Sequence, residues 1–166
     1  MTGALNALRE AVVEQLRQAG VQAVAAMESR PAARWREAVA AVSLAGVKCA
    51  PGGFQDYLGV ARDGDGTERE LYGRAAELTL AIDIFAPRDG GESACQEAAE
   101  QVAESLICRG AAGLNALELQ TGQTEFLERD SLYRQKTTCR CKAWLIARRG
   151  EDSGAFTDFE VRGRLQ

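Results

Sequence analysis

The sequence contains no histidine among its 166 residues. Histidine is the side chain that most often transfers protons near neutral pH, and it is the commonest metal ligand. Its absence excludes histidine-based triads and cysteine–histidine dyads. The patterns G-x-x-x-x-G-K-[ST], G-x-G-x-x-G and G-x-S-x-G are also missing. Lysine, carboxylate or thiol catalysis stays open, but no arrangement of residues points to it. We therefore expect a protein that is not an enzyme and holds no cofactor or metal.

Long apolar runs are missing as well. No stretch approaches the roughly 20 apolar residues that span a bilayer, and the first residues lack a basic segment followed by an apolar one. A formal charge of -4 and a pI of about 5.0 do not favour non-specific binding to nucleic acid or anionic membranes. The length fits one domain. We expect that domain to be made and kept in a cytoplasm, with no membrane partner.

The five cysteines are an odd number and form no paired framework. We expect reduced, buried thiols, because free cysteine is among the most buried residue types. One residue separates Cys139 from Cys141, which is too few for a zinc knuckle. The stretch "DGDGTE", 63–68, begins like a calcium loop, but its sixth position is Glu68 and its twelfth is Arg74. We expect the tip of a hairpin or loop there instead.

Apolar periodicity predicts two helices. Leu5, Leu8, Val12 and Leu16 recur at spacings of three and four within 3–19, with Thr2 as a candidate N-cap and Gly20 as the stop. A second helix begins near Ser93, which forms a capping-box pattern with Gln96, and ends at Gly110. Its buried stripe is predicted to be Cys95, Ala99, Val102 and Leu106, and its wet face Glu97, Glu100 and Glu104.

Alternating residues predict the strands. The clearest is 71–86, where Leu78, Leu80, Ile82 and Ile84 share one face while Glu77, Thr79 and Asp83 share the other. We also expect strands at 21–27, 37–49, 114–120, 132–149 and 156–163, and a strand or loop at 124–130. Helix, strands, helix, strands is the order typical of an α+β fold, with two helices packed on one face of a mainly antiparallel sheet.

The most basic part of the chain is the predicted strand 132–149. Six cations and no acid lie between Ser131 and Gly150, and Arg134, Lys136, Arg140, Lys142 and Trp144 all point to the same side of the strand. Three interpretations stay open: a solvated face, a face that meets the acidic second helix of another copy, or a contact with a nucleic acid backbone. Trp144 and Ile146 continue the face with apolar groups, which fits a protein interface better than a purely electrostatic one.

A second candidate site is the stretch "GGFQDYLG", 52–59. The segment from about 50 to 70 shows no helix pattern, and loops of this length in compact domains are usually functional or disordered. Its aromatic content argues against disorder. Either the aromatics fold back on the core, or the segment is a long contact loop. The contact residues would then be Phe54, Asp56, Tyr57 and Leu58, together with Tyr72 at its far end.

In the order of its elements and in several short motifs, the chain resembles the tail terminator, or tail completion, minor tail proteins of bacteriophages and prophages. The resemblance is carried by "ALNALREAVVEQLRQAG", "GGFQDYLG", "ELYGRAAELTLAIDIFAP", "ESACQEAAEQV" and the terminal "TDFEVRG". These motifs are short, and no catalytic signature anchors them.

The resemblance implies a structural protein of the virion tail that assembles in the bacterial host cytoplasm. Such subunits form a hexameric ring on the finished tail tube, stop tube polymerisation and offer a surface for head–tail joining. The implied partners are further copies of the chain, the tail tube protein and a head–tail connector protein, with DNA passing through the ring lumen. The loop 52–59 would lie at a contact surface, and the basic strand 134–142 at a subunit interface or the lumen. A connector or neck protein, and a small ligand-binding α+β domain, are the alternatives.

Overall fold

The structure is a computed structural model that describes residues 2–25, 35–51, 54–148 and 158–165. Two helices, α1 (Thr2–Gln18) and α2 (Gly91–Arg109), accompany seven strands. The strands are β1 (Gln22–Ala25), β2 (Val39–Pro51), β3 (Tyr57–Arg62), β4 (Glu68–Pro87), β5 (Asn115–Leu127), β6 (Leu132–Arg148) and β7 (Asp158–Arg162). Short 3-10 turns, η2 (Phe54–Asp56) and η3 (Arg88–Gly90), precede β3 and α2.

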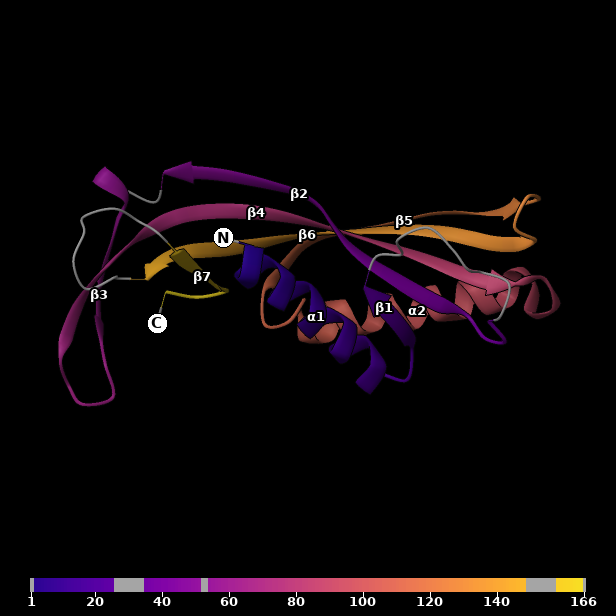
Figure 1. Cartoon of the computed structure of the whole chain (residues 1–166), viewed down its shortest axis with the longest axis horizontal. Coiled ribbons are helices and arrows are strands. Elements are labelled where there is room, and N and C mark those ends of the chain that lie inside the picture. The colour runs from indigo at the N-terminus through magenta and orange to yellow at the C-terminus, as the bar shows by residue number, and fades with distance from the viewer. Residues whose placement is uncertain (1, 26–34, 52–53, 149–157, 166) are drawn as a thin grey trace.

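The strands form one mixed sheet in the order β1-β2-β4-β6-β5. β1 runs parallel to β2, and every other pairing is antiparallel. β3 pairs with the first residues of β4, and β7 with the last residues of β6. Both helices lie on the same side of the sheet, below it in Figure 1. The predicted α+β fold, with two helices on one face of a mainly antiparallel sheet, is confirmed.

The core lies between the helices and the sheet. Leu78, Leu80, Ile82 and Ile84 of β4 are fully buried, as their alternation predicts, and meet the buried stripe of each helix. Each such side chain contributes roughly 1.5–3 kcal/mol by leaving water. The residues between them, such as Glu77 and Asp83, are partly exposed on the opposite face. In the described part of the chain, neither helix combines the length and apolarity needed to cross a bilayer.

Outside the segment 50–70, described below, the predicted helices and strands hold to within a few residues, except that the two segments at 114–130 form a single strand. The predicted strand 114–120 and the predicted strand or loop 124–130 are replaced by one strand, β5 (Asn115–Leu127), whose register against β6 shifts twice, between Ala116 and Glu118 and between Thr121 and Thr124. These bulges interrupt the alternation that would have marked a continuous strand. The predicted capping box at Ser93 is wrong: α2 begins at Gly91 and no side chain caps it, while the Gln96 amide donates to Glu92 at 3.0 Å. Parts of the predicted strands 21–27 and 156–163 lie outside the described residues.

Gln15 joins the two helices. Its side-chain amide donates to the Gly110 carbonyl at 2.8 Å and to the Ser105 hydroxyl at 3.1 Å, and its carbonyl oxygen accepts from the Ala112 N–H at 2.8 Å. The last carbonyls of a helix have no partner within that helix. Gln15 of α1 therefore supplies polar partners for the end of α2 and for the turn that leads into β5.

Candidate interaction site

The segment 50–70 is a β-hairpin, not the long loop that the sequence predicts. β2 continues to Pro51, and after the short turn η2 the chain forms β3 and returns as β4 from Glu68. Figure 1 shows this hairpin extending beyond the helices, at the left of the view. The sequence gives little sign of it, because β3 is largely solvent-exposed on both faces and has no apolar alternation.

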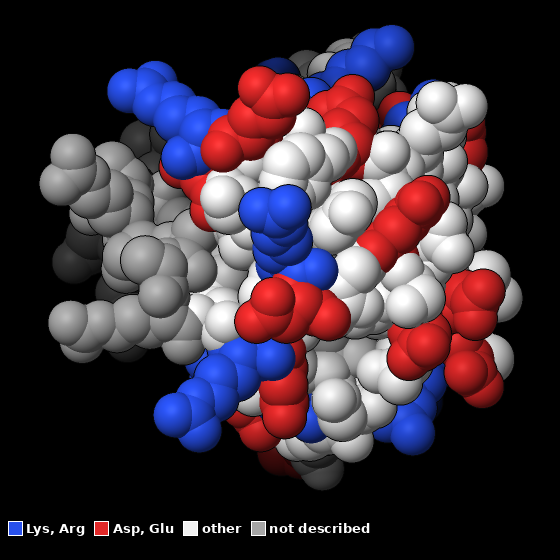
Figure 2. All heavy atoms as spheres, turned by 90° about the vertical axis from the view of Figure 1, so that its right-hand side faces the viewer, with Lys and Arg blue, Asp and Glu red and all other residues white. Residues whose placement is uncertain are grey.

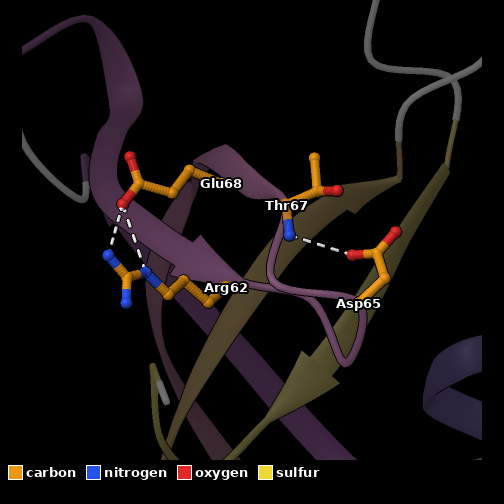
Figure 3. Close-up of polar contacts among 4 residues, drawn as sticks. All are labelled: Arg62, Asp65, Thr67 and Glu68. Atoms are coloured by element: carbon orange, nitrogen blue, oxygen red, sulfur yellow. Dashed lines mark hydrogen bonds and ion pairs between the residues drawn. The ribbon is translucent and has the colours of Figure 1, made fainter.

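The tip of the hairpin is a turn at 63–67, within the stretch 63–68 where the sequence predicts the tip of a hairpin or loop. The Asp63 N–H donates to the Thr67 carbonyl at 2.9 Å, and the Thr67 N–H donates to the Asp65 carboxylate at 2.9 Å (Figure 3). This second bond lowers the pKa of the Asp65 carboxyl. Arg62 and Glu68 pair across the strands at 3.0 Å. No group of three or more metal-ligating side chains lies within the described residues, this turn included.

An ion pair and a ring contact hold the start of the hairpin against β4. Arg74 donates to the Asp56 carboxylate from two nitrogens, at 3.2 and 3.3 Å. Tyr57 meets Tyr72 edge to face with ring centroids 5.6 Å apart, and the Tyr72 hydroxyl donates to Glu70 at 2.8 Å. The backbone of Asp56 and of the residue before it is left-handed, with φ of 60° and 52°, which marks a constrained turn.

The same segment presents apolar side chains to solvent. Phe54 is 87% exposed and Val60 54% exposed, Tyr57 is also exposed, and Leu58 is half-buried. The aromatics therefore do not fold back on the core as a group: Tyr57 leans on Tyr72, while Phe54 projects. We call Phe54, Tyr57 and Val60 the hairpin patch. Exposed apolar groups held on a constrained backbone are typical of a contact surface.

Two arginines of the basic strand are neutralised within the chain. Arg140 pairs with Glu77 of β4 at 3.2 Å and with Glu118 of β5 at 2.7 Å, and Arg134 pairs with Glu125 of β5 at 3.0 Å. The predicted alternation of β6 is correct from Tyr133 to Trp144, and the cations of this stretch lie on the face of the sheet away from the helices. Ile146, predicted to continue that face as an exposed apolar group, is buried instead. The acids that neighbour them come from the adjacent strands. This part of the open face is therefore a mosaic of both signs rather than a basic surface.

The two lysines on this face of β6 have weaker contacts than the arginines. Lys136 is exposed and lies opposite Asp83 in the register of β4 and β6. The Lys142 ammonium lies 5.5 Å from the centroid of the Trp144 ring, within the range of a cation–π contact. Trp144 pairs with Ala75 of β4, next to the Arg74 that holds Asp56. The apolar end of β6 thus lies near the base of the hairpin, whereas Arg134 lies at the far end of the strand.

Charges elsewhere on the surface are also mixed. Glu97, Glu100 and Glu104 lie on the exposed side of α2, as predicted, and that helix is on the opposite side of the sheet from the β6 cations. Figure 2 looks at the end of the molecule that carries the turn between β5 and β6, and positive and negative side chains are interspersed over it. The described residues therefore favour solvated faces over one acidic and one basic docking face.

All five cysteines are free, and their burial differs from the prediction. Cys95, Cys139 and Cys141 are buried, but Cys49 and Cys108 are exposed. The Sγ atoms of Cys139 and Cys141 are 3.6 Å apart. Burial raises the pKa of the Cys95 thiol to about 11, and the hydrogen bond between the Cys141 and Cys139 thiols together with burial raises the pKa of Cys141. These thiols stay protonated near neutral pH.

One hollow bears on the ligand-binding alternative. A cavity of about 440 Å³ opens between the end of α1, β1 and Trp35. Its lining includes Arg17, whose Nε donates to the Ala23 carbonyl at 2.9 Å, and Gln22, whose amide donates to Glu37 at 2.9 Å. Both polar side chains already have partners within the chain, so they do not identify a ligand.

The residues singled out from the sequence thus form two groups, one at the hairpin and one on β6. The two groups approach each other where Trp144 of β6 lies near the base of the hairpin. Sequence reasoning missed the acids that neutralise β6 and the exposed apolar residues Val47, Val60, Ile107 and Leu117. The sequence predicts that Glu77 points away from the core. It does not predict the order of strands, which places Glu77 beside Arg140. Comparison of the chain with protein-family models and with curated proteins gives no match.

Proposed function

We propose that this protein is a phage tail terminator, which assembles as a ring, caps the tail tube and provides the surface for head–tail joining. The proposal starts from the sequence resemblance described above. The observation that supports it best is the hairpin patch: apolar side chains project from a hairpin that extends beyond the helical layer. An apolar patch displayed in this way suits docking to another protein better than chemistry on a small molecule.

Capping follows from simple geometry. A tube grows because each added ring presents the same edge as the ring before it. A terminator binds that edge and offers no equivalent edge to the next tube ring. In the proposed complex the hairpin patch packs on the tube protein. The internal pairs Asp56–Arg74 and Arg62–Glu68 satisfy the neighbouring charges, so the contact leaves few of them unpaired.

The test is electron microscopy of particles induced from a strain that lacks this gene. Overlong or ragged tails without heads are expected. Complementation with a Phe54→Ala, Tyr57→Ala double variant should fail to restore tail length, while the purified variant still unfolds cooperatively and loses no more stability than the roughly 0.5–1.5 kcal/mol of the Tyr57–Tyr72 ring contact. Phe126→Ala is the matched control, because Phe126 is also an exposed aromatic but lies at the turn between β5 and β6.

Other results would redirect the proposal. Normal-length tails detached from filled heads in the deletion strain would place the protein at the head–tail connector instead. Normal capping by the double variant would remove the hairpin patch from the tube contact. Particles identical to those of the parent strain would leave no role in the tail.

A further inference from the structure

Among the described residues, each side of the sheet ends in a strand edge that no further strand covers. β1 covers only Val39–Val42 of β2, so residues 43–51 have β4 on one side and no strand on the other within the described part of the chain. β5 pairs with β6 alone over the same described ranges. The edge of a strand presents unpaired N–H and C=O groups that can receive another chain.

One row of paired residues across the sheet connects the two edges. Val47 pairs with Leu78, Leu78 with Cys141, and Cys141 with Ala116. Leu117, the bulged residue after Ala116, therefore lies at the opposite end of the row that begins at Val47. Val47 is 40% exposed and Leu117 51% exposed. Each edge thus carries an exposed apolar side chain at the same level of the sheet.

A helix adds to the β5 side. Gln101, Ser105 and Cys108 line a cleft toward α1, and Val102 and Leu106 are buried in the core. At 100° per residue, Ile107 lies on the remaining flank of α2, away from α1. It is 69% exposed, and α2 is the helix that contacts β5. The β5 side therefore presents Leu117 and Ile107, and the β2 side presents Val47.

Strand direction is also compatible with a contact between copies. β2 and β6 both run antiparallel to β4, and β5 runs antiparallel to β6. β2 and β5 therefore run in opposite directions. If copies are related by rotation about an axis along the strands, β5 of one copy meets β2 of the next in the antiparallel sense that the rest of the sheet uses. Bulges at Leu44–Gly46 and Ala116–Glu118 interrupt both edges at this row, so side chains rather than a continuous ladder would make the contact there.

We propose that the β2 edge at Val47 packs against the β5 edge at Leu117 and Ile107 of a second copy. The contact is heterologous, because different surfaces meet, and repeating it builds a ring when the rotation closes. It replaces the contact between charged faces considered from the sequence, since acids of neighbouring strands already neutralise Arg134 and Arg140. The inference rests on the ring assembly in the proposed function, but it does not depend on what the ring caps.

Two charge substitutions test it. The unaltered chain should associate with a mass that is a multiple of 17.8 kDa, measured by light scattering and sedimentation as concentration rises. Val47→Glu and Leu117→Glu should each give a monomer, because each buries a carboxylate in the contact. An equimolar mixture should then form a dimer of about twice the chain mass, since each variant keeps one intact edge. The dimer also proves that both variants are folded.

The control is Phe126→Glu, which adds the same charge to β5 away from the Val47 row and should associate as the parent does. A parent chain that stays monomeric at its highest attainable concentration, variants that each associate normally, or a mixture that stays monomeric would each overturn the proposal. The proposed function fails separately: a parent chain that associates through this contact in solution, together with tails of normal length on particles from the deletion strain, would refute capping while this contact stands.

Discussion

Gln15 offers the sharpest test of how the helical layer is joined. Gln15→Leu keeps a side chain of similar size and good helix propensity but removes the three short hydrogen bonds to Ser105, Gly110 and Ala112. A hydrogen bond contributes a net 0.5–1.5 kcal/mol, and a buried group left without a partner costs about 1–3 kcal/mol. Because the site is partly buried, water can replace some of the lost partners. We expect the free energy of unfolding to fall by about 2–3 kcal/mol.

Urea unfolding followed by circular dichroism measures this change. The midpoint should fall while the m-value stays constant, and the melting temperature should drop by roughly 4–12 °C. Gln18→Leu is the matched control, because Gln18 lies one turn later on α1, is exposed and donates only to Glu14 at 3.3 Å. Its effect should stay within about 0.5 kcal/mol. A loss below about 0.5 kcal/mol for Gln15→Leu would refute the view that this side chain joins α1 to the end of α2.

Three further predictions concern the reactivity of the thiols, the pH dependence of stability and a tight backbone contact. Cys49 and Cys108 should react with Ellman's reagent in the native protein, and the three buried thiols only after unfolding. Burial raises the pKa of the Cys95 thiol from 9.0 to about 11, so the thiol ionises at lower pH in the unfolded chain than in the folded one. The free energy of unfolding should therefore fall by about 2–3 kcal/mol as the pH rises from 9 to 11. The Cys95→Val variant should not show this loss. Gly73→Ala should lower the free energy of unfolding by more than about 2 kcal/mol, because the added Cβ would lie 2.1 Å from a backbone carbonyl oxygen of β6. Gly46→Ala is the control: no atom lies close to the added Cβ, so in the same urea assay the free energy of unfolding should change by less than about 0.5 kcal/mol.

Local patterns predicted the elements of this fold well. The apolar spacing in α1 and the alternation of β4 correspond directly to side chains that are buried in the structure. The hairpin after Pro51 was missed because apolar residues of β3 are found on both of its partly exposed faces, so the strand shows no apolar alternation. The continuity of β5 was hidden by bulges, which shift the alternation from one face to the other.

The candidate site was less predictable because it depends on which strands are neighbours. The direction of Arg140 followed from alternation within β6, but its pairing with Glu77 and Glu118 depends on β4 and β5 flanking that strand. Sequence spacing does not encode this order. Exposure of Phe54 is likewise a tertiary property, since the alternative of folding back on the core uses the same residues.

The long central ladder has a consequence for how the chain reaches its fold. In the pairing of β4 with β6, Pro87 meets Leu132 and Gly73 meets Ile146, so partners are 45 to 73 residues apart in sequence. Contacts of this separation slow folding, because a long loop must close before they form. At a synthesis rate of about 5–20 residues per second, several seconds pass between the synthesis of β4 and that of β6. During this time the apolar face of β4 is present, but the edge that pairs with β6 has no partner. The interval before β6 leaves the ribosome is therefore the time at which this protein is most exposed to misassembly with other nascent chains.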